Sequence, residues 1–439
     1  MSTQHPEEPS PATPPNHVAD RQAASGRHHA PSRGAGRRPT PPVVRHVGDP
    51  ERRARLAVRH ALHPAHRVAD TLAAARAMTV LHATEAASIH LAVRARTVAE
   101  SPDDVDRALY VDRSVVRQLA MRRTLFVFPR DLLPAALGSA SARVAAEQRR
   151  VIARDVEAHG IADDGQAWLD SARAAVTHRL AGSEALSAQR LREELAELEG
   201  SIRYSPGKSY GGVAQLAPRV LTLLGAEGVL TRGTNAGPWR LNRPTWTLMA
   251  AWLGEAPVAS TTHDGYAQLV SRWLRSFGPG TEADLQWWLG STKAAVRDAL
   301  HALSAVPVSL NGDETGWLLP DDVDPVGPVE PWAALLPTLD PTTMGWRGRE
   351  FYLDPAHRPY VFDSNGNGGN TAWWNGRIVG SWVQDATAVV RVVPAPGAAL
   401  ERRASAALDA EAARLTAWLD GVRISNVYTS QLMKHQPLP

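Results

Sequence analysis

The chain of 439 residues contains no cysteine. That absence excludes disulfide bonds, thiolate catalysis and zinc sites built on cysteine, and it agrees with a reducing compartment. No apolar run approaches the roughly 20 residues that cross a bilayer, and the N-terminus shows no apolar signal segment. Histidines are scattered without the spacing of metal ligands. We therefore expect a cytoplasmic protein with no metal and no other cofactor.

Lysine is nearly absent too, because Lys208, Lys293 and Lys434 are the only three in the chain. Arginine carries almost all of the positive charge. The formal net charge is +3, but residues 1–60 alone hold ten arginines against five acidic residues. The rest of the chain is close to neutral, so any surface that binds an acidic partner must be a local face and not a property of the whole body.

Residues 1–50 are rich in proline, serine, glycine and arginine and have no apolar periodicity, which predicts a disordered basic tail. Beyond it, helices followed by a glycine-punctuated hairpin occur three times, in 51–135, 136–250 and 251–325. In the clearest copy, Thr281 opens a capping box and Gly312 marks a hairpin turn. Three helices followed by a two-stranded wing are typical of a winged helix-turn-helix.

Residues 326–439 have a different texture, with short apolar runs separated by Asn-Gly turns. The runs predict strands at 371–374, 377–383 and 389–393, an amphipathic helix at about 398–419 and a last strand at 422–428. We therefore predict an α+β fold, in which tandem winged helix-turn-helix units precede a small β-rich, barrel-like domain with a C-terminal helix.

The second copy contains a polar, glycine-rich loop around Lys208, between a helix and the predicted helix 217–224. A nucleotide-binding P-loop is excluded, because Ile202 stands where the motif needs its first glycine. The loop either contacts a DNA phosphate or is a plain surface loop. After the second helix, 229–232 and 239–241 predict the two strands of a wing.

Two polar side chains, His82 and Thr84, stand two residues apart in an apolar frame. In an extended segment they face the same way, so they could hold one water molecule, with His82 accepting its proton or orienting it and Thr84 fixing its direction. The alternative is structural: His82 satisfies backbone groups, and Thr84 caps a helix that begins near Ala86. Glu85 either adds a carboxylate to the same site or is a solvated residue of a first helical turn.

Arginines cluster shortly after this segment, in a stretch that alternates into apolar residues and reads as a hairpin edge. We expect five basic side chains to contact DNA phosphates, and all of them except Arg219 to gather on one face of the molecule. They are Arg117, Arg122, Arg123, Lys208 and Arg219.

The chain resembles the winged-helix DNA glycosylases of the AlkZ and YcaQ type. The segments that carry the resemblance are 80–84, 114–124, 205–226, 335–345, 362–383 and 410–423. It implies tandem winged helices with a barrel-like domain, no cofactor, and double-stranded DNA, alkylated or crosslinked, as the partner. It also implies a monofunctional enzyme that excises bulky alkylated purines by hydrolysis.

In the family that the chain resembles, the catalytic motif is Gln-aliphatic-Gln or Gln-aliphatic-Asp, and His82-Ala83-Thr84 stands at that position. His82 keeps a hydrogen-bonding group and adds a base, whereas Thr84 shortens the reach and removes the amide or carboxylate. Two other functions fit the sequence. One is a DNA-binding regulator or silent paralogue, and the other is an interaction scaffold that binds no DNA.

Overall fold

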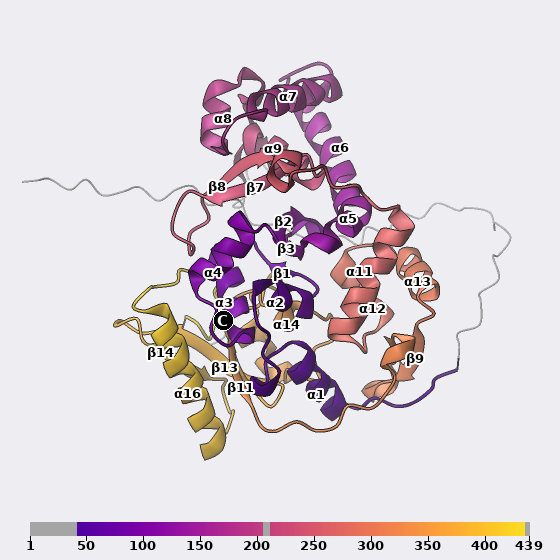
Figure 1. Ribbon diagram of the computed structural model, residues 1–439, viewed down its shortest axis with the longest axis vertical. Coiled ribbons are helices and arrows are strands. Elements are labelled where there is room, and N and C mark those ends of the chain that lie inside the picture. The colour runs from indigo at the N-terminus through magenta and orange to yellow at the C-terminus, as the bar shows by residue number, and fades with distance from the viewer. Residues whose placement is uncertain (1–41, 205–210, 435–439) are drawn as a thin grey trace, which may run out of the picture.

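Helices and short antiparallel sheets alternate along the chain in the computed structural model, which describes residues 42–204 and 211–434 (Figure 1). Most of the predicted tail lies outside these residues. Its described end is ordered, because α1 (Asp49–Arg59) begins inside it and Val47 is fully buried against apolar side chains of the strands near residues 308 and 318. The prediction of disorder up to residue 50 is therefore wrong for its last residues.

The first unit contains the His82 segment at its centre. It comprises α2 (Thr71–Ala77), β1 (Leu81–His82), α3 (Ala86–Arg96), α4 (Pro102–Asp106), β2 (Val115–Leu119) and β3 (Leu125–Pro129). Asp70 caps α2 through the N–H of Ala73, and a capping box at Ser101 starts α4. The three strands form one antiparallel sheet in the order β1-β3-β2, so β3 lies between the other two.

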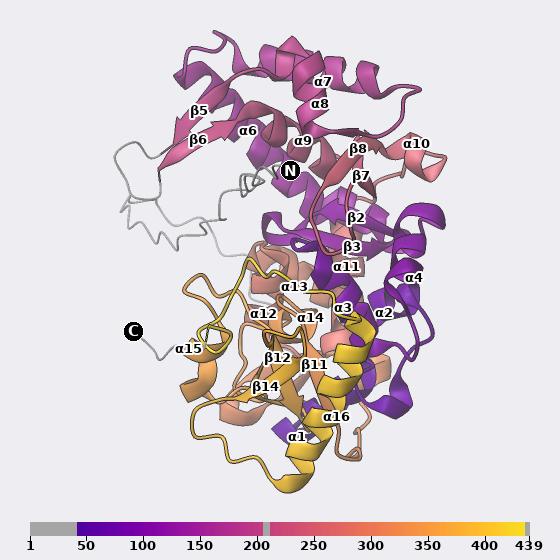
Figure 2. The same ribbon diagram turned by 90° about the vertical axis from the view of Figure 1, so that its left-hand side faces the viewer.

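The second unit follows the linking helices α5 (Leu133–Ala136) and α6 (Ala142–Ala158). It comprises α7 (Gly165–Leu180), β4 (Leu186–Ser187), α8 (Ala188–Glu194), α9 (Leu216–Ala226), β7 (Leu230–Asn235) and β8 (Pro244–Leu248). Between α8 and α9, β5 (Ser201–Tyr204) pairs with β6 (Gly212–Gln215) in a hairpin that the sequence analysis missed. Figure 2 shows this hairpin reaching outward from the unit. Lys208 lies outside the described residues.

The predicted strand at 239–241 is wrong, because these residues form a turn and the second wing strand is β8. The side chain of Asn235 closes this turn. Its Nδ2 donates to the carbonyls of Gly237 and Leu241, each at 2.9 Å, and its Oδ1 accepts the N–H of Arg243 at 2.8 Å. The chain therefore pairs with β7 again only from Pro244 onward.

The third unit comes after the short α10 (Met249–Leu253). It contains α11 (Thr262–Phe277), α12 (Glu282–Leu289), α13 (Lys293–Ala302), β9 (Val306–Ser309) and β10 (Thr315–Leu318). The capping box at Thr281 and the hairpin that follows the third helix are both confirmed.

One pairing recurs in all three units: the segment between the first and second helices pairs with the last strand. In the first unit His82 of β1 faces Phe126 of β3, and in the second unit β4 pairs with β8. In the third unit a single bridge joins Gly280 to Trp317 of β10. Each unit therefore has the same connectivity, and His82 occupies this shared position in the first one.

The C-terminal part contains a four-stranded antiparallel sheet with helices around it. Its elements are β11 (Ala333–Leu336), α14 (Pro341–Met344), α15 (Arg358–Val361), β12 (Thr371–Trp374), β13 (Arg377–Gln384), β14 (Val390–Pro394) and α16 (Arg402–Leu419). The strand order β11-β12-β13-β14 leaves β11 and β14 at the edges, so these strands form an open sheet. Leu408 and Leu415 of α16 pack in one apolar cluster with Trp382 of this sheet.

The strand predicted at 422–428 is wrong. Side chains accept the backbone N–H groups that a neighbouring strand would have paired. Gln384 accepts the N–H of Ile424, and Glu85 accepts those of Val427 and Tyr428.

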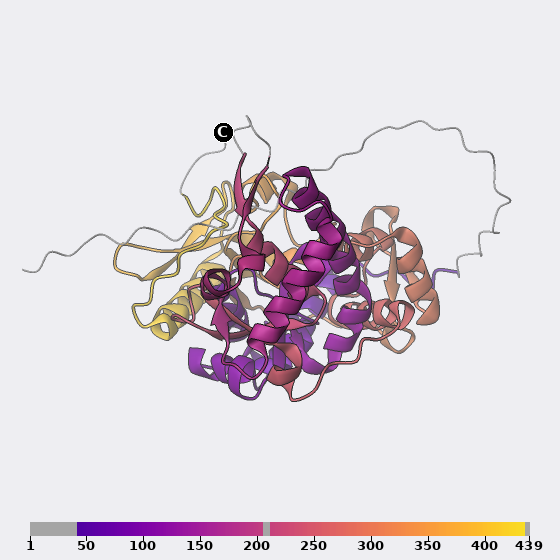
Figure 3. The same ribbon diagram turned by 90° about the horizontal axis from the view of Figure 1, so that it is seen from above.

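A continuous apolar core joins the first and third units to strands, helices and loops of the C-terminal part, with Trp273, Trp346 and Trp373 in it, whereas the second unit has a core of its own. Viewed from above, the C-terminal sheet and the third unit lie on opposite sides of the rest of the molecule (Figure 3). The predicted four-part division of the folded chain stays a prediction. None of the helices within the described residues is long and apolar enough to span a membrane.

Candidate functional site

The turn formed by residues 82–85 connects β1 to α3 near the middle of the molecule (Figure 1). Its backbone is fixed by the pairing of β1 with β3 and by a hydrogen bond of 2.9 Å from the N–H of Ala83 to the carbonyl of Leu125. All residues of α3 are buried, so the helix behind the turn is held on every side. The side chains of the turn therefore project from a rigid support.

His82 is only 6% exposed, and its ring lies 4.8 Å from the ring of Phe126. Its Nδ1 is buried and has no hydrogen-bond partner among the described residues. Burial, and then the positive charge of Arg122, lower the pKa of His82 to about 3. The imidazole is therefore neutral at neutral pH, where it can orient a water molecule but is a weak proton acceptor.

Thr84 is half-buried, and its hydroxyl makes no side-chain hydrogen bond to any described residue, His82 included. It does not cap α3, because the N-cap residue is Glu85 and no side chain caps that helix. The structural alternative predicted such a cap and a backbone partner for the buried His82, and neither is present in the described residues. The hydroxyl of Thr84 is thus free to bind water or substrate.

Glu85 is only 6% exposed, so it is not a solvated residue of a first turn. Its Oε1 accepts the N–H groups of Val427 at 2.8 Å and Tyr428 at 3.1 Å, while Oε2 is buried without a partner in the described part of the chain. Burial raises the pKa of Glu85 to about 7, and the two backbone hydrogen bonds oppose this shift. This carboxyl can therefore exchange a proton near neutral pH.

The raised pKa of Glu85 predicts a pH-dependent stability. The folded state binds this proton more tightly than the unfolded chain, so the contribution is fully present below pH 4.5 and is lost as the pH rises through about 7. Relative to Glu85→Gln, the parent protein should lose about 3 kcal/mol of unfolding free energy across this range. Urea denaturation at pH 4.5 and pH 8 measures the difference. The exposed Glu314, changed to glutamine, is the control and should show no such trend.

Arg122 lies in the β2–β3 turn beside this site, in a left-handed conformation with φ 53°. Its guanidinium stacks over Trp287 of α12 at 4.1 Å from the ring centre. The guanidinium of Arg349 lies 5.3 Å from the centre of the same ring and 4.4 Å from the centre of the Phe362 ring. Sequence analysis missed Trp287 and Arg349, because nothing in their local sequence indicates that three distant segments meet here.

The other predicted phosphate ligands lie elsewhere. Arg117 is only 6% exposed and donates to the hydroxyl of Tyr110 at 2.7 Å, so it does not offer a free guanidinium at the surface. Arg219 forms an ion pair of 2.7 Å with Asp155, and the exposed Arg123 donates to Gln148 at 3.4 Å, so both lie along α6. The structure therefore places the four described arginines in three separate environments.

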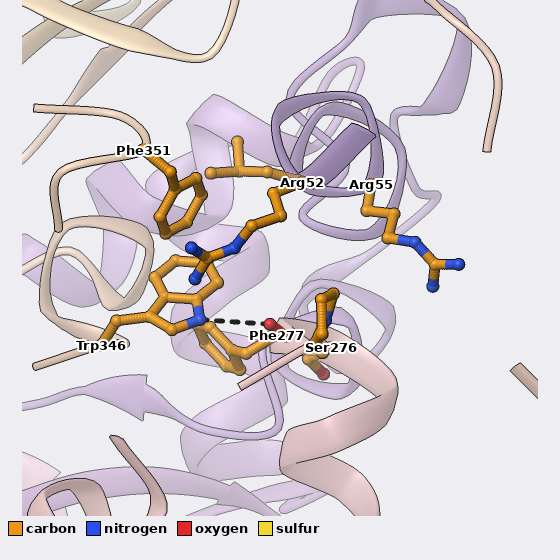
Figure 4. Close-up of a pocket in the computed structure, with 9 residues that line it drawn as sticks. Arg52, Arg55, Ser276, Phe277, Trp346 and Phe351 are labelled. Carbon is orange, nitrogen blue, oxygen red and sulfur yellow. Dashed lines mark hydrogen bonds between the residues drawn. The ribbon is translucent and has the colours of Figure 1, made fainter. Parts of the chain in front are cut away.

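Depressions elsewhere on the surface are less suited to DNA chemistry. Figure 4 shows one in which the Arg52 guanidinium stacks on Phe351 at 3.7 Å, while the indole N–H of Trp346 donates to the carbonyl of Phe277 at 3.2 Å. These groups satisfy one another, which is typical of packing. A second depression, of about 340 Å³, is lined by Asp131 and Asp264 and by Arg272, whose guanidinium is already paired with Asp131 at 2.5 Å.

Comparison with known proteins identifies the family. A family described as "DNA glycosylase AlkZ-like" matches residues 75–418. The chain belongs to the AlkZ-like DNA glycosylase family. The solved structure of the Streptomyces sahachiroi DNA glycosylase AlkZ has the same fold, with a TM-score of 0.68 and 20% sequence identity over 85% of this chain and 97% of that one. No curated protein sequence matches the chain.

Membership of the AlkZ-like family places the chain among DNA glycosylases, whose substrate is DNA. The matched residues include the turn at 82–85 and the Arg122, Trp287 and Arg349 cluster beside it. The second unit, with its own core, also lies inside the match.

Proposed function

We propose that this AlkZ-like glycosylase removes bulky alkylated purines from double-stranded DNA by hydrolysing the N-glycosidic bond at the turn formed by residues 82–85. The observation that carries the proposal is the composition of this turn. A neutral buried imidazole, a hydroxyl without a side-chain partner among the described residues and a carboxyl with a pKa near 7 follow one another within four residues. The position of His82 and Thr84 resembles that of the catalytic motif of the family.

Excision of an alkylated purine needs little proton transfer from the protein to the leaving base. Alkylation at N7 or N3 makes the purine a cationic leaving group, so it departs with the bonding electron pair as a neutral base. The site then has to stabilise an oxocarbenium-like sugar and position a water molecule, whose oxygen bonds to C1′. His82 orients this water, Thr84 directs it, and the ionised Glu85 can accept the released proton.

The repeated architecture also supports the proposal that the protein binds DNA. We propose that the three units are winged helices, since each has three helices, a two-stranded hairpin and the same pairing of the first interhelical segment with the last strand. Arg122, Arg123 and Arg219, together with Lys208, would engage DNA phosphates and give salt-dependent binding.

A single-turnover assay on duplex DNA containing 7-methylguanine tests this function. We expect release of the free base, an abasic site in the product strand and no reaction with unmodified duplex. Binding of the same duplex without base release would favour the second candidate, a DNA-binding protein without catalysis. Borohydride trapping of a covalent adduct that Lys208→Ala abolishes would replace hydrolysis by a lyase mechanism.

A further inference from the structure

Arg122 and Arg349 form a partly buried pair of like charges, and within the described residues no acidic side chain lies at ion-pair distance from either of them. Arg122 is half-buried, Arg349 is only 5% exposed, and the Nε atoms of both are buried without a hydrogen-bond partner. Neither guanidinium forms an ion pair with a described carboxylate. Buried charges in proteins are normally paired, so this arrangement calls for a separate explanation.

Two carboxylates on the loop that carries Arg349 and beside it accept hydrogen bonds from backbone groups. Asp284 accepts the N–H groups of Arg347 at 2.8 Å and Gly348 at 2.9 Å. Glu350 accepts the backbone N–H of Arg349 at 2.8 Å. These contacts shape the loop that carries Arg349, and neither carboxylate forms an ion pair with its guanidinium.

The charge of Arg349 disfavours the charged form of Arg122. Burial, and then the charge of Arg349, lower the pKa of Arg122 to about 10, so Arg122 is still protonated at neutral pH. Both groups stack against Trp287, which is half-buried and holds them at the edge of the core. An anion that reaches both would remove the repulsion, and planar guanidinium forks match the oxygens of a phosphate.

We propose that Arg122 and Arg349, stacked on Trp287, bind one phosphodiester of the strand that carries the excised base, next to that base. This inference rests on the proposed function for the identity of the ligand as DNA. Its position follows from the β2–β3 turn, in which Arg122 lies three residues before Leu125, whose carbonyl accepts the N–H of Ala83 beside His82. The site would fix the sugar–phosphate backbone relative to the turn at 82–85, so that C1′ meets the oriented water.

Duplexes with a single neutral methylphosphonate linkage test the proposal. The linkage is moved one phosphate at a time past the 7-methylguanine, and equilibrium binding is measured. At one position beside the lesion the parent protein should lose about tenfold in affinity, the scale of one charge-assisted contact. Arg349→Met should bind all-phosphate DNA about tenfold more weakly and be insensitive to the linkage at that same position. Its salt slope should fall by about one unit.

Arg391→Gln, which changes an exposed side chain of β14, is the matched control and should keep the full response to the neutral linkage. Independent, additive losses for Arg349→Met and the linkage at every position would overturn the proposal. A structural arginine would also lower the melting temperature when replaced, whereas removal of one of two repelling charges should leave it unchanged or raise it. If Arg349→Met does not fold, Arg122→Gln is measured over the same series.

The two proposals fail in different ways. The parent protein could respond to the neutral linkage, and lose that response in Arg349→Met, while it releases no base. This result would support the phosphate site and contradict the glycosylase function. Base release with no position-specific linkage response would keep the function and reject the site.

Discussion

His82→Ala should slow the single-turnover release of 7-methylguanine by about 10² or more, the usual scale for a group that acts directly on the attacking water. Binding of the modified duplex should persist, because the arginine contacts are retained. His82→Gln should restore much of the rate, since an amide can orient water and glutamine occupies this place in the motif that the segment resembles. Rate and affinity are measured on the same preparation.

The pH dependence of the rate of base release distinguishes the role of His82 from that of Glu85. The pKa of His82 is lowered to about 3, so this residue stays neutral between pH 5 and pH 8 and contributes no inflection there. An inflection near pH 7 that Glu85→Gln removes would assign the titrating group to Glu85. A lower melting temperature of His82→Ala together with unchanged base release would give His82 a structural role instead.

Asp340→Asn should destabilise the protein by about 3–5 kcal/mol, the range for breaking a buried ion pair from one side. Arg96 and Asp340 are both 0% exposed and form a bidentate pair at 2.7 and 2.8 Å. Arg96 belongs to α3 and Asp340 caps α14, so the pair joins the helix behind the turn at 82–85 to the C-terminal part. The substitution leaves a buried guanidinium charge without its counterion.

Urea denaturation measures this loss. The double variant Arg96→Met/Asp340→Asn should recover part of the stability, because it removes the unpaired charge. The exposed pair of Arg391 with Asp385 is the control, and Arg391→Gln should cost at most about 1 kcal/mol. If Asp340→Asn and Arg391→Gln lowered the unfolding free energy equally, the explanation by burial of the Arg96–Asp340 pair would be wrong.

Local signals in the sequence were sufficient to predict many elements of the fold, but the helices α5 to α7 were not predicted. Caps, glycine turns and apolar periodicity identified α11 to α13 with their hairpin, and the strands β12 to β14. The hairpin β5–β6 was missed because it has little apolar alternation, and the strand expected at 239–241 was misplaced because Asn235 closes a longer turn. Side-chain hydrogen bonds of this kind leave no periodic pattern in a sequence.

The candidate site was predicted only in part. The polar residues His82 and Thr84 stood out from an apolar frame, but the burial of Glu85 depends on Val427 and Tyr428 at the other end of the chain. The same holds for Arg122, which meets Trp287 and Arg349 only in the folded protein. Contacts between segments so far apart are set by the tertiary fold, and one sequence alone does not indicate them.

Residues 44–47 also cover the outer edge of β9, with backbone hydrogen bonds from Val44 to Pro307, from Val47 to Ser309 and from Ser309 to Arg45. Unpaired strand edges invite pairing with other chains, and natural proteins blunt them in several ways. Here the segment that precedes α1 pairs with the free edge of β9 and so protects the hairpin, and its Val47 packs on the apolar side chains of Val308 and Leu318. A chain shortened to begin at α1 would keep every helix and strand of the third unit and yet expose a template for edge-to-edge aggregation.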